Sequence, residues 1–241
     1  MGNILSYVGF LLRERSLRPY YDYKNRSKKL GEFLGRDPTE IDAVLAELDS
    51  SGFLQELGER LAPYSNIKTG SMLSPLRAPV MYSFIRLFKP GIVVETGVAS
   101  GVSTAVILKA MSANGKGRLY SIDLKASPET DPFVRLPPGK QPGWLVPDDL
   151  KDRWEFHAGK SSDILPALLP KLGTIDVFIH DSLHTYQNMR YEYHEAYPYI
   201  RSGGVMASDD ITWNNAWPEM VQEVQPIRTT DFYALGFMMK R

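Results

Sequence analysis

Acidic and histidine residues gather at two places in the sequence, each directly after a short apolar run. The segment 180–186 reads His-Asp-Ser-Leu-His-Thr-Tyr and follows the apolar residues 177–179. The segment 208–210 reads Ser-Asp-Asp and follows the apolar residues 205–207. Such runs are typical of buried parallel strands, and ligands bind beyond the carboxyl ends of those strands. We therefore expect chemistry where these two segments meet.

Asp181, Asp209 and Asp210 would bring three carboxylates to neighbouring strand ends. Like charges a few ångströms apart raise one another's pKa, and a bound divalent cation removes that cost. Oxygen ligands suit Mg²⁺ or another hard cation, so the three aspartates are the predicted metal ligands. The alternative for Asp209 and Asp210 is a helix cap beside a solvated acid.

A proton acceptor is expected in the same place. His184 follows Asp181 closely in the sequence, and histidine titrates near neutral pH, so His184 is the predicted catalytic base. Asp181 is the second candidate for that role. The alternative for His184 is a structural residue that is hydrogen-bonded beneath the loop.

A glycine turn forms a further part of the expected site. The β-branched run 92–94 ends at Glu95. The chain then turns at Gly97 and Gly101, and residues 104–111 suit a helix packed on a sheet. This order is typical of the entry to a nucleotide-type ligand site. Glu95 would repel the phosphates of a dinucleotide, but it would attract a cation such as the amino-acid end of S-adenosylmethionine.

Asp123 ends a second predicted strand over residues 117–123. An acid about 20 residues after the glycine turn is where ribose hydroxyls are held. NAD sites and S-adenosylmethionine sites share this feature, so Asp123 does not separate them. Glu95 and the spacing of Gly97 and Gly101 favour S-adenosylmethionine, because a dinucleotide site has the pattern Gly-x-Gly-x-x-Gly. The alternative is a strand-to-helix turn with no ligand.

Alternating strand and helix patterns surround these residues and predict a doubly wound, Rossmann-like α/β domain. The C-terminal segment 226–241 contains two short β-like runs, as if a hairpin completed the sheet. The other predicted strands are 92–95, 117–123, 154–157, 176–180 and 204–208, and the predicted helices are 79–87, 104–111, 159–169 and 187–200.

The N-terminal part has a different character. Residues 11–29 carry seven basic side chains against two acidic ones, whereas residues 31–60 carry eight acidic side chains against two basic ones. Apolar stripes over residues 29–54 predict two helices joined by a turn. We expect a helical segment over 1–73, a larger domain over 74–241, and a homodimer through the apolar helices. The basic run is interpreted as a solvated face, with contact to a membrane surface or nucleic acid as the alternative.

Composition narrows the class of protein. The 241 residues are 43% hydrophobic, which is enough for one sizeable domain with a small appendage. The formal net charge is zero, so bulk attraction to nucleic acid is not expected. The chain has no cysteine, which excludes thiol catalysis and cysteine-ligated zinc and is compatible with a reducing compartment such as the cytoplasm. No apolar run approaches the roughly 20 residues that span a bilayer, so stable membrane insertion is not expected.

Taken together, these motifs resemble class I S-adenosylmethionine-dependent methyltransferases. The similar features are Glu95-Thr96-Gly97 with Gly101, the acid Asp123, the run 180–186, the pair Asp209-Asp210 and the segment 213–217. The nearest group is the bacterial small-molecule O-methyltransferases that include the macrocin and aminocoumarin sugar enzymes. The resemblance covers about residues 75–241 and implies a seven-stranded mixed sheet with a C-terminal antiparallel hairpin. It also implies that the N-terminal helices serve dimerisation and cover the substrate.

The resemblance implies roles for individual residues. Glu95 and Gly97 would hold the methionine portion of S-adenosylmethionine, Asp123 the ribose, and Gly159 and Ser161 the adenine. The remaining implied cofactor contacts lie in the glycine turn, at Ala99, Ser100, Gly101 and Ser103. Asp181, Asp209 and Asp210 would bind the metal. Leu183 stands where the family more commonly has an acid, so a further acidic contact is not expected.

The expected activity is methyl transfer to a hydroxyl group of a small molecule, such as a sugar or a secondary metabolite. S-adenosyl-L-methionine would be the methyl donor and Mg²⁺ the metal cofactor. One alternative is a methyltransferase-like scaffold that binds or regulates without catalysis. Another is an NAD-linked oxidoreductase, against which the absent Gly-x-Gly-x-x-Gly pattern argues.

Overall fold

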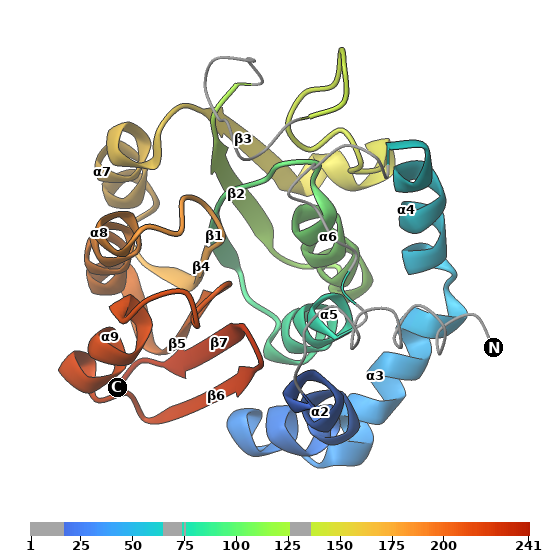
Figure 1. Cartoon of the computed structure of the whole chain (residues 1–241), viewed down its shortest axis with the longest axis horizontal. Helices are drawn as coiled ribbons and strands as arrows, with labels where there is room; N and C mark the ends of the chain where they lie inside the picture. Colours follow the sequence, from blue (N-terminus) through green and yellow to red (C-terminus); the bar gives the residue numbers. More distant parts are fainter. Residues whose placement is uncertain (1–16, 65–73, 75, 126–135) are drawn as a thin grey trace.

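A seven-stranded sheet forms the centre of the computed structural model (Figure 1). The structure describes residues 17–64, 74, 76–125 and 136–241. The strand order is β3-β2-β1-β4-β5-β7-β6, in which β7 runs antiparallel to both neighbours and the other pairs are parallel. This confirms the predicted doubly wound sheet with a C-terminal hairpin. The strands are β1 (Ile92–Thr96), β2 (Arg118–Asp123), β3 (Trp154–Ala158), β4 (Ile175–His180), β5 (Ile200–Ser208), β6 (Arg228–Phe232) and β7 (Leu235–Met239).

Helices cover both faces of the sheet, so its central strands are buried on both sides (Figure 1). Val93 and Val94 are both 0% exposed, and they belong to two separate apolar clusters, one on each face. One face carries α5 (Arg77–Phe88) and α6 (Val102–Asn114) together with the N-terminal helices. The other face carries α7 (Ser161–Leu172), α8 (Tyr186–Ala196) and α9 (Ala216–Val224). The described residues also include short 3₁₀ helices at η1 (Ala62–Tyr64), η2 (Asp148–Arg153) and η3 (Tyr197–Tyr199).

The N-terminal helices are α2 (Arg18–Leu34), α3 (Pro38–Ser50) and α4 (Phe53–Leu61). Asp37 caps α3 by accepting from the Thr39 amide at 2.8 Å, and Glu40 accepts from the Asp37 amide at 3.3 Å. The predicted helix pair is therefore present, and α4 extends it beyond the predicted end at residue 54.

These helices share an apolar core with the sheet. The Phe33 ring of α2 lies 5.9 Å from the Phe237 ring of β7, and both side chains belong to one cluster. Asp22 of α2, fully buried, accepts hydrogen bonds from Lys29 Nζ at 2.6 Å and from the Tyr233 amide at 2.8 Å. The predicted boundary between residues 73 and 74 stays a prediction, as does the homodimer. Residues 1–16 and 65–73 of the predicted N-terminal segment, which include the start of the basic run, lie outside the described residues.

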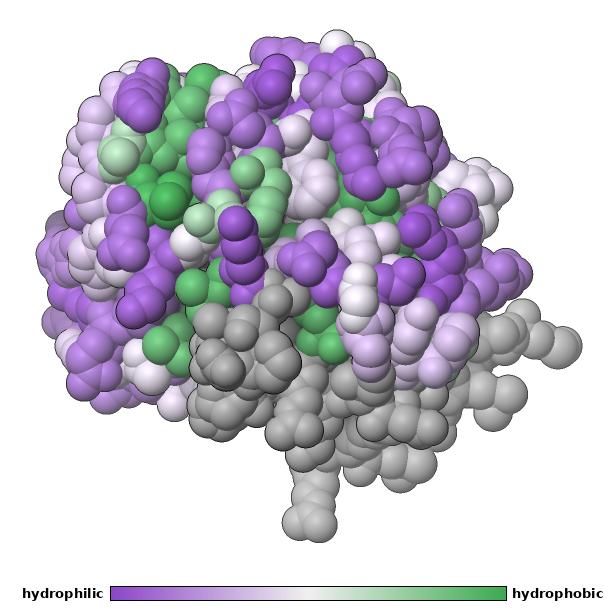
Figure 2. All heavy atoms as spheres, turned by 90° about the horizontal axis from the view of Figure 1, so that it is seen from above, coloured by the Kyte–Doolittle hydropathy of each residue, from purple (hydrophilic) through white to green (hydrophobic). Residues whose placement is uncertain are grey.

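The surface shows where apolar side chains remain accessible. On the face seen in Figure 2, hydrophobic side chains reach the surface in small groups among hydrophilic ones. Among the helices that the structure describes, none combines the length and apolar character needed to cross a bilayer. Two large hydrophobic residues that stay exposed lie close to the candidate site in the sequence, Leu183 directly before His184 and Trp213 shortly after Asp210.

Candidate functional site

The glycine turn lies directly against the end of β4. Gly97 has a φ of +85°, and a Cβ atom at this position would lie 1.9 Å from the main-chain oxygen of Asp181. The Asp181 amide donates to the Thr96 carbonyl at 2.8 Å. Only glycine allows this approach, which brings the first carboxylate of the cluster beside the turn.

Glu95 is fully buried behind the turn. Its carboxylate accepts hydrogen bonds from the hydroxyls of Ser103, Thr104 and Ser121, each at 2.8 Å. Burial raises the pKa of Glu95, although the three hydroxyl donors oppose that shift. The structure therefore places Glu95 against the start of α6, where it holds Ser103, and its predicted contact with the methionine portion of the cofactor stays a prediction.

Asp123 is hydrogen-bonded to the glycine turn at Val98 and Ala99. Its Oδ2 accepts from the amides of Val98 at 2.9 Å and Ala99 at 2.8 Å. Ala99 has a φ of +46°, a left-handed value that is uncommon for a residue with a side chain. The Gly159 amide donates to the main-chain oxygen of Asp123 at 2.9 Å, so the end of β3 adjoins the same place.

Ser100 and Gly101, two further predicted cofactor contacts, are backed by the segment 143–145. The Gly143 amide donates to the Ala99 carbonyl at 2.9 Å, and the Leu145 amide donates to the Ser100 carbonyl at 3.0 Å. A Cβ atom on Gly101 would lie 2.7 Å from the Cα atom of Gly143. This packing gives Gly101 a role in the fold, and the sequence carried no signal for the pairing of two segments so far apart.

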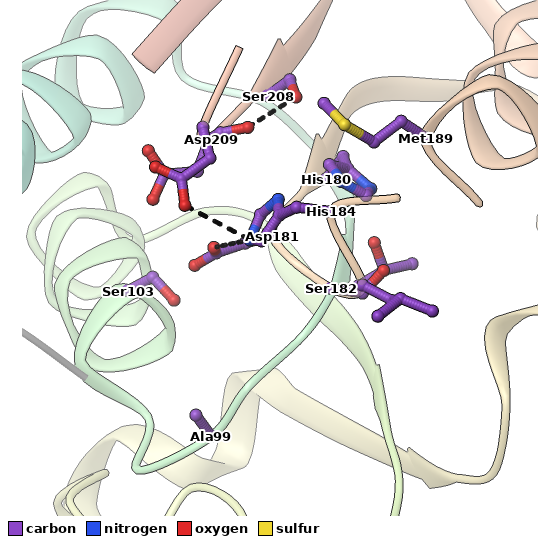
Figure 3. Close-up of polar contacts among 12 residues, drawn as sticks. Ala99, Ser103, His180, Asp181, Ser182, His184, Met189, Ser208 and Asp209 are labelled. Atoms are coloured by element: carbon purple, nitrogen blue, oxygen red, sulfur yellow. Dashed lines mark hydrogen bonds and ion pairs between the residues drawn. The ribbon is translucent and has the colours of Figure 1, made fainter. Parts of the chain in front are cut away.

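The predicted catalytic residues do come together beyond β4 and β5. His184 Nε2 lies 3.7 Å from Asp181 Oδ1 and 3.7 Å from Asp210 Oδ2. Figure 3 shows Asp181, His184 and Asp209 converging, with Ser103 beside them and Ala99 farther away at the tip of the turn. Burial and the neighbouring charge of Asp209 raise the pKa of Asp181 well above its usual value.

His184 lies among aromatic rings. Its ring centroid is 5.3 Å from that of His180 and 5.2 Å from that of Trp213. Burial, and then the nearby His180, lower the pKa of His184 to about 4. The imidazole of His184 is therefore neutral at pH 7, which leaves a nitrogen lone pair available to accept a proton.

Arg77, a residue that sequence analysis did not single out, supplies the positive charge of the cluster. Its Nη1 donates to both carboxylate oxygens of Asp209, at 2.6 and 2.5 Å, and lies 3.5 Å from Asp210 Oδ1. Burial alone would lower the pKa of Arg77, but the charges of Asp209, Asp210 and Asp181 raise it. The guanidinium therefore stays charged at neutral pH.

Asp181, Asp209 and Asp210, the predicted metal ligands, lie in this cluster. Three carboxylates are a suitable donor set for a hard cation. Within the residues that the structure describes, however, no group of three or more histidine, aspartate or glutamate side chains is arranged to hold a metal ion. Asp209 directs both oxygens at Arg77. The carboxylates are thus brought together as predicted, but in the arrangement seen they do not fit a metal, and the metal assignment stays a prediction.

Glu192 of α8 is a second residue that sequence analysis missed. It is fully buried and accepts hydrogen bonds from Thr96 Oγ1 at 2.5 Å and Ser182 Oγ at 2.7 Å, and it lies 2.6 Å from His180 Nδ1. Burial alone would raise the pKa of Glu192, but His180 and the hydroxyl donors lower it to about 2. Glu192 therefore joins α8 to the end of β1 and to the end of β4.

Comparisons with known proteins identify a family for the part of the chain that carries these residues. Residues 94–211 match a family described as a methyltransferase domain. A search of curated proteins finds no match.

Among solved structures, an O-methyltransferase from Bacillus cereus in complex with SAH is 17% identical, with a TM-score of 0.55 over 78% of this chain and 89% of that chain. The O-methyltransferase TomG from Streptomyces achromogenes, involved in tomaymycin synthesis and solved in complex with SAM, is 16% identical, with a TM-score of 0.57 over 78% and 90% of the two chains. The methyltransferase MycE from the mycinamycin biosynthetic pathway, in complex with Mg, SAH and mycinamycin VI, is 16% identical, with a TM-score of 0.52 over 78% of this chain and 54% of that chain. At these identities the likeness shows the fold.

Proposed function

We propose that this chain, which is a class I S-adenosylmethionine-dependent methyltransferase, transfers a methyl group to a hydroxyl oxygen of a small molecule. The observation that carries the proposal is the position of His184. It lies 3.7 Å from two carboxylates and follows the strand end that rests on the glycine turn. A donor bound at the turn and an acceptor beside His184 would therefore be neighbours.

The residues at the turn suit the donor. S-adenosylmethionine carries a cationic sulfonium centre that supplies an electrophilic methyl group. Asp123 and Asp181 present acidic side chains at the ends of β2 and β4, and the Asp181 side chain is 34% exposed. We propose that Asp123 binds the ribose, that Ser103 and Gly97 bind the methionine portion, and that Gly159 borders the adenine. Glu95 would act through Ser103, which it holds.

His184 would accept the proton of the acceptor hydroxyl. Its Nε2 faces Asp181 and Asp210, and the carboxylate of Asp210 stabilises the imidazolium that proton transfer creates. Asp181 is the second candidate for the base. Holding the hydroxyl in line with the methyl group is worth several kcal/mol, and the packing of His184 against Trp213 fixes one side of that geometry.

The acceptor would meet an apolar wall. Trp213 is 65% exposed, and its ring centroid lies 5.2 Å from that of His184. Leu183, the residue directly before His184 in the sequence, is 53% exposed. Exposed aromatic faces pack against the apolar faces of sugar and aromatic rings. This wall supports a hydroxylated ring compound, such as a sugar or a secondary metabolite, as the acceptor.

We also propose that the protein acts in the cytoplasm.

Calorimetric titration with S-adenosylhomocysteine tests the donor site. We expect micromolar binding, weakened at least tenfold by Asp123→Ala. Asp152→Ala, an acid on the exposed side of η2, is the matched control and should leave binding unchanged. No binding by the folded native chain would contradict the proposal and favour a scaffold without catalysis.

Transfer itself is measured with methyl-labelled S-adenosylmethionine and a panel of sugars, phenols and glycosylated metabolites. His184→Gln should bind S-adenosylhomocysteine as the native chain does and lose at least 100-fold in transfer rate. Equal transfer by both proteins would remove His184 from its role.

A further inference from the structure

Arg77, the first residue of α5, contacts Asp209, which directly follows β5. Arg77 lies 132 positions before Asp209 in the chain, and its side chain is 22% exposed while that of Asp209 is 20% exposed. One terminal nitrogen of the guanidinium contacts both oxygens of Asp209. The ion pair is therefore partly shielded from water, where charge interactions are stronger than at an open surface.

The guanidinium and a divalent metal would compete for the same oxygens. Mg²⁺ binds oxygen at about 2.0–2.1 Å and demands near-octahedral geometry. Arg77 Nη1 already lies 2.5–2.6 Å from Asp209 and 3.5 Å from Asp210. A metal bound to the same carboxylate would lie within a few ångströms of a fixed positive charge, which costs Coulomb energy at low local dielectric.

We propose that Arg77 is the resident cation of the carboxylate cluster formed by Asp181, Asp209 and Asp210, and that this cluster takes up no divalent metal while Arg77 is in place. The inference rests on the proposed function, because it names the charge that balances the site of methyl transfer. Arg77 is a positioning residue. It holds Asp209 and Asp210 at the end of β5, and Asp210 in turn faces His184.

Manganese provides a direct probe, because its free ion has an electron paramagnetic resonance signal that bound ion loses. The full-length native chain is titrated with Mn²⁺ alongside Arg77→Met. The native chain should leave the Mn²⁺ signal unchanged up to about 1 mM. The variant should bind one Mn²⁺ ion per chain at a concentration at least tenfold below that limit, because two carboxylates lose their cation. Adding Asp209→Asn to Arg77→Met should abolish that uptake.

Arg86→Met is the matched control. Arg86 also lies on α5, its side chain is 19% exposed, and it pairs with a carboxylate, that of Glu47, at 2.7 Å. The control substitution removes the same charge from the same helix away from the cluster, so this variant should bind no Mn²⁺. Circular dichroism establishes that each variant is folded. Arg77→Gln serves if Arg77→Met does not fold.

Two results would overturn the inference. One is uptake of Mn²⁺ by the native chain that Asp209→Asn removes, which would establish the metal site predicted from sequence. The other is a folded Arg77→Met or Arg77→Gln protein that binds no Mn²⁺. S-adenosylhomocysteine is titrated into the same samples, because a native chain that does not bind it contradicts the proposed function whatever the Mn²⁺ result.

Discussion

The main-chain oxygen of Asp181 occupies the space that a side chain at position 97 would need. We predict that Gly97→Ala destabilises the protein by at least about 2 kcal/mol more than a glycine replacement that meets only backbone strain, which costs about 1–2 kcal/mol. Gly115→Ala is the matched control, since Gly115 has a φ of +62° and no atom lies within 4 Å of the position that its Cβ atom would take. Urea unfolding measures both. Equal losses would show that the turn can move away from β4.

The glycine turn and its surroundings include features that the sequence alone predicts and others that it does not. Apolar β-branched runs and paired glycines are local patterns, so the strands, the turn and the acids that end β2, β4 and β5 were predictable. The direction of the Glu95 side chain was not, because it depends on which hydroxyls of α6 and β2 pack behind the strand. Arg77 was beyond sequence reasoning for a similar reason, since its partner lies on an element brought to it only by the complete sheet.

Asp176 ties the start of β4 to the chain before β1. It accepts from the amides of Gly91 at 2.7 Å and Ile92 at 2.9 Å, and from Arg201 Nε at 2.6 Å. Burial would raise its pKa, but these donors, led by Arg201, lower it. A carboxylate whose folded pKa is lowered stabilises the protein above its unfolded pKa of about 3.9, and loses that effect as pH falls through the folded value.

We predict that Asp176→Asn lowers the free energy of unfolding by about 1–3 kcal/mol at pH 7. The difference from the native chain should shrink as the pH falls below about 4. Urea titrations between pH 3 and pH 7 measure the effect, with Asp152→Asn as an exposed control. A difference that stays constant across this range would mean that the charge of Asp176 contributes nothing.

Phe33 joins the N-terminal helices to the sheet. We predict that Phe33→Ala costs about 3–5 kcal/mol, because the ring is 2% exposed and packs against Phe237. Tyr21→Ala is the control on the same helix, since Tyr21 is 62% exposed. Trp144 lies 5.2 Å from Tyr64 of the N-terminal part, so fluorescence is measured in a Trp144→Phe background. The other three tryptophans all lie after residue 150 and report on the sheet domain, while circular dichroism reports on every helix. The two signals should change together on unfolding, and separate transitions would show that residues 1–73 fold independently.

Glu192 is the common partner of three side chains at the site, those of Thr96, His180 and Ser182. We predict that Glu192→Gln costs about 2–3 kcal/mol, because an amide cannot accept from all of its present donors. Glu195→Gln, on the same helix, is the control. Thermal unfolding measures stability, and a loss no larger than the control's would mean that the hydroxyl donors find other partners.

The glycine turn is held from two sides, by the carboxylate of Asp123 and by the amides of Gly143 and Leu145. A loop fixed in this way has already lost its conformational entropy during folding, so a ligand that binds there does not have to order it. Association would then be limited mainly by diffusion and orientation, and not by a slow rearrangement of the loop. The entropy cost of ordering residues 97–101 is thus met when the chain folds, and it does not reduce the affinity for a ligand that binds there.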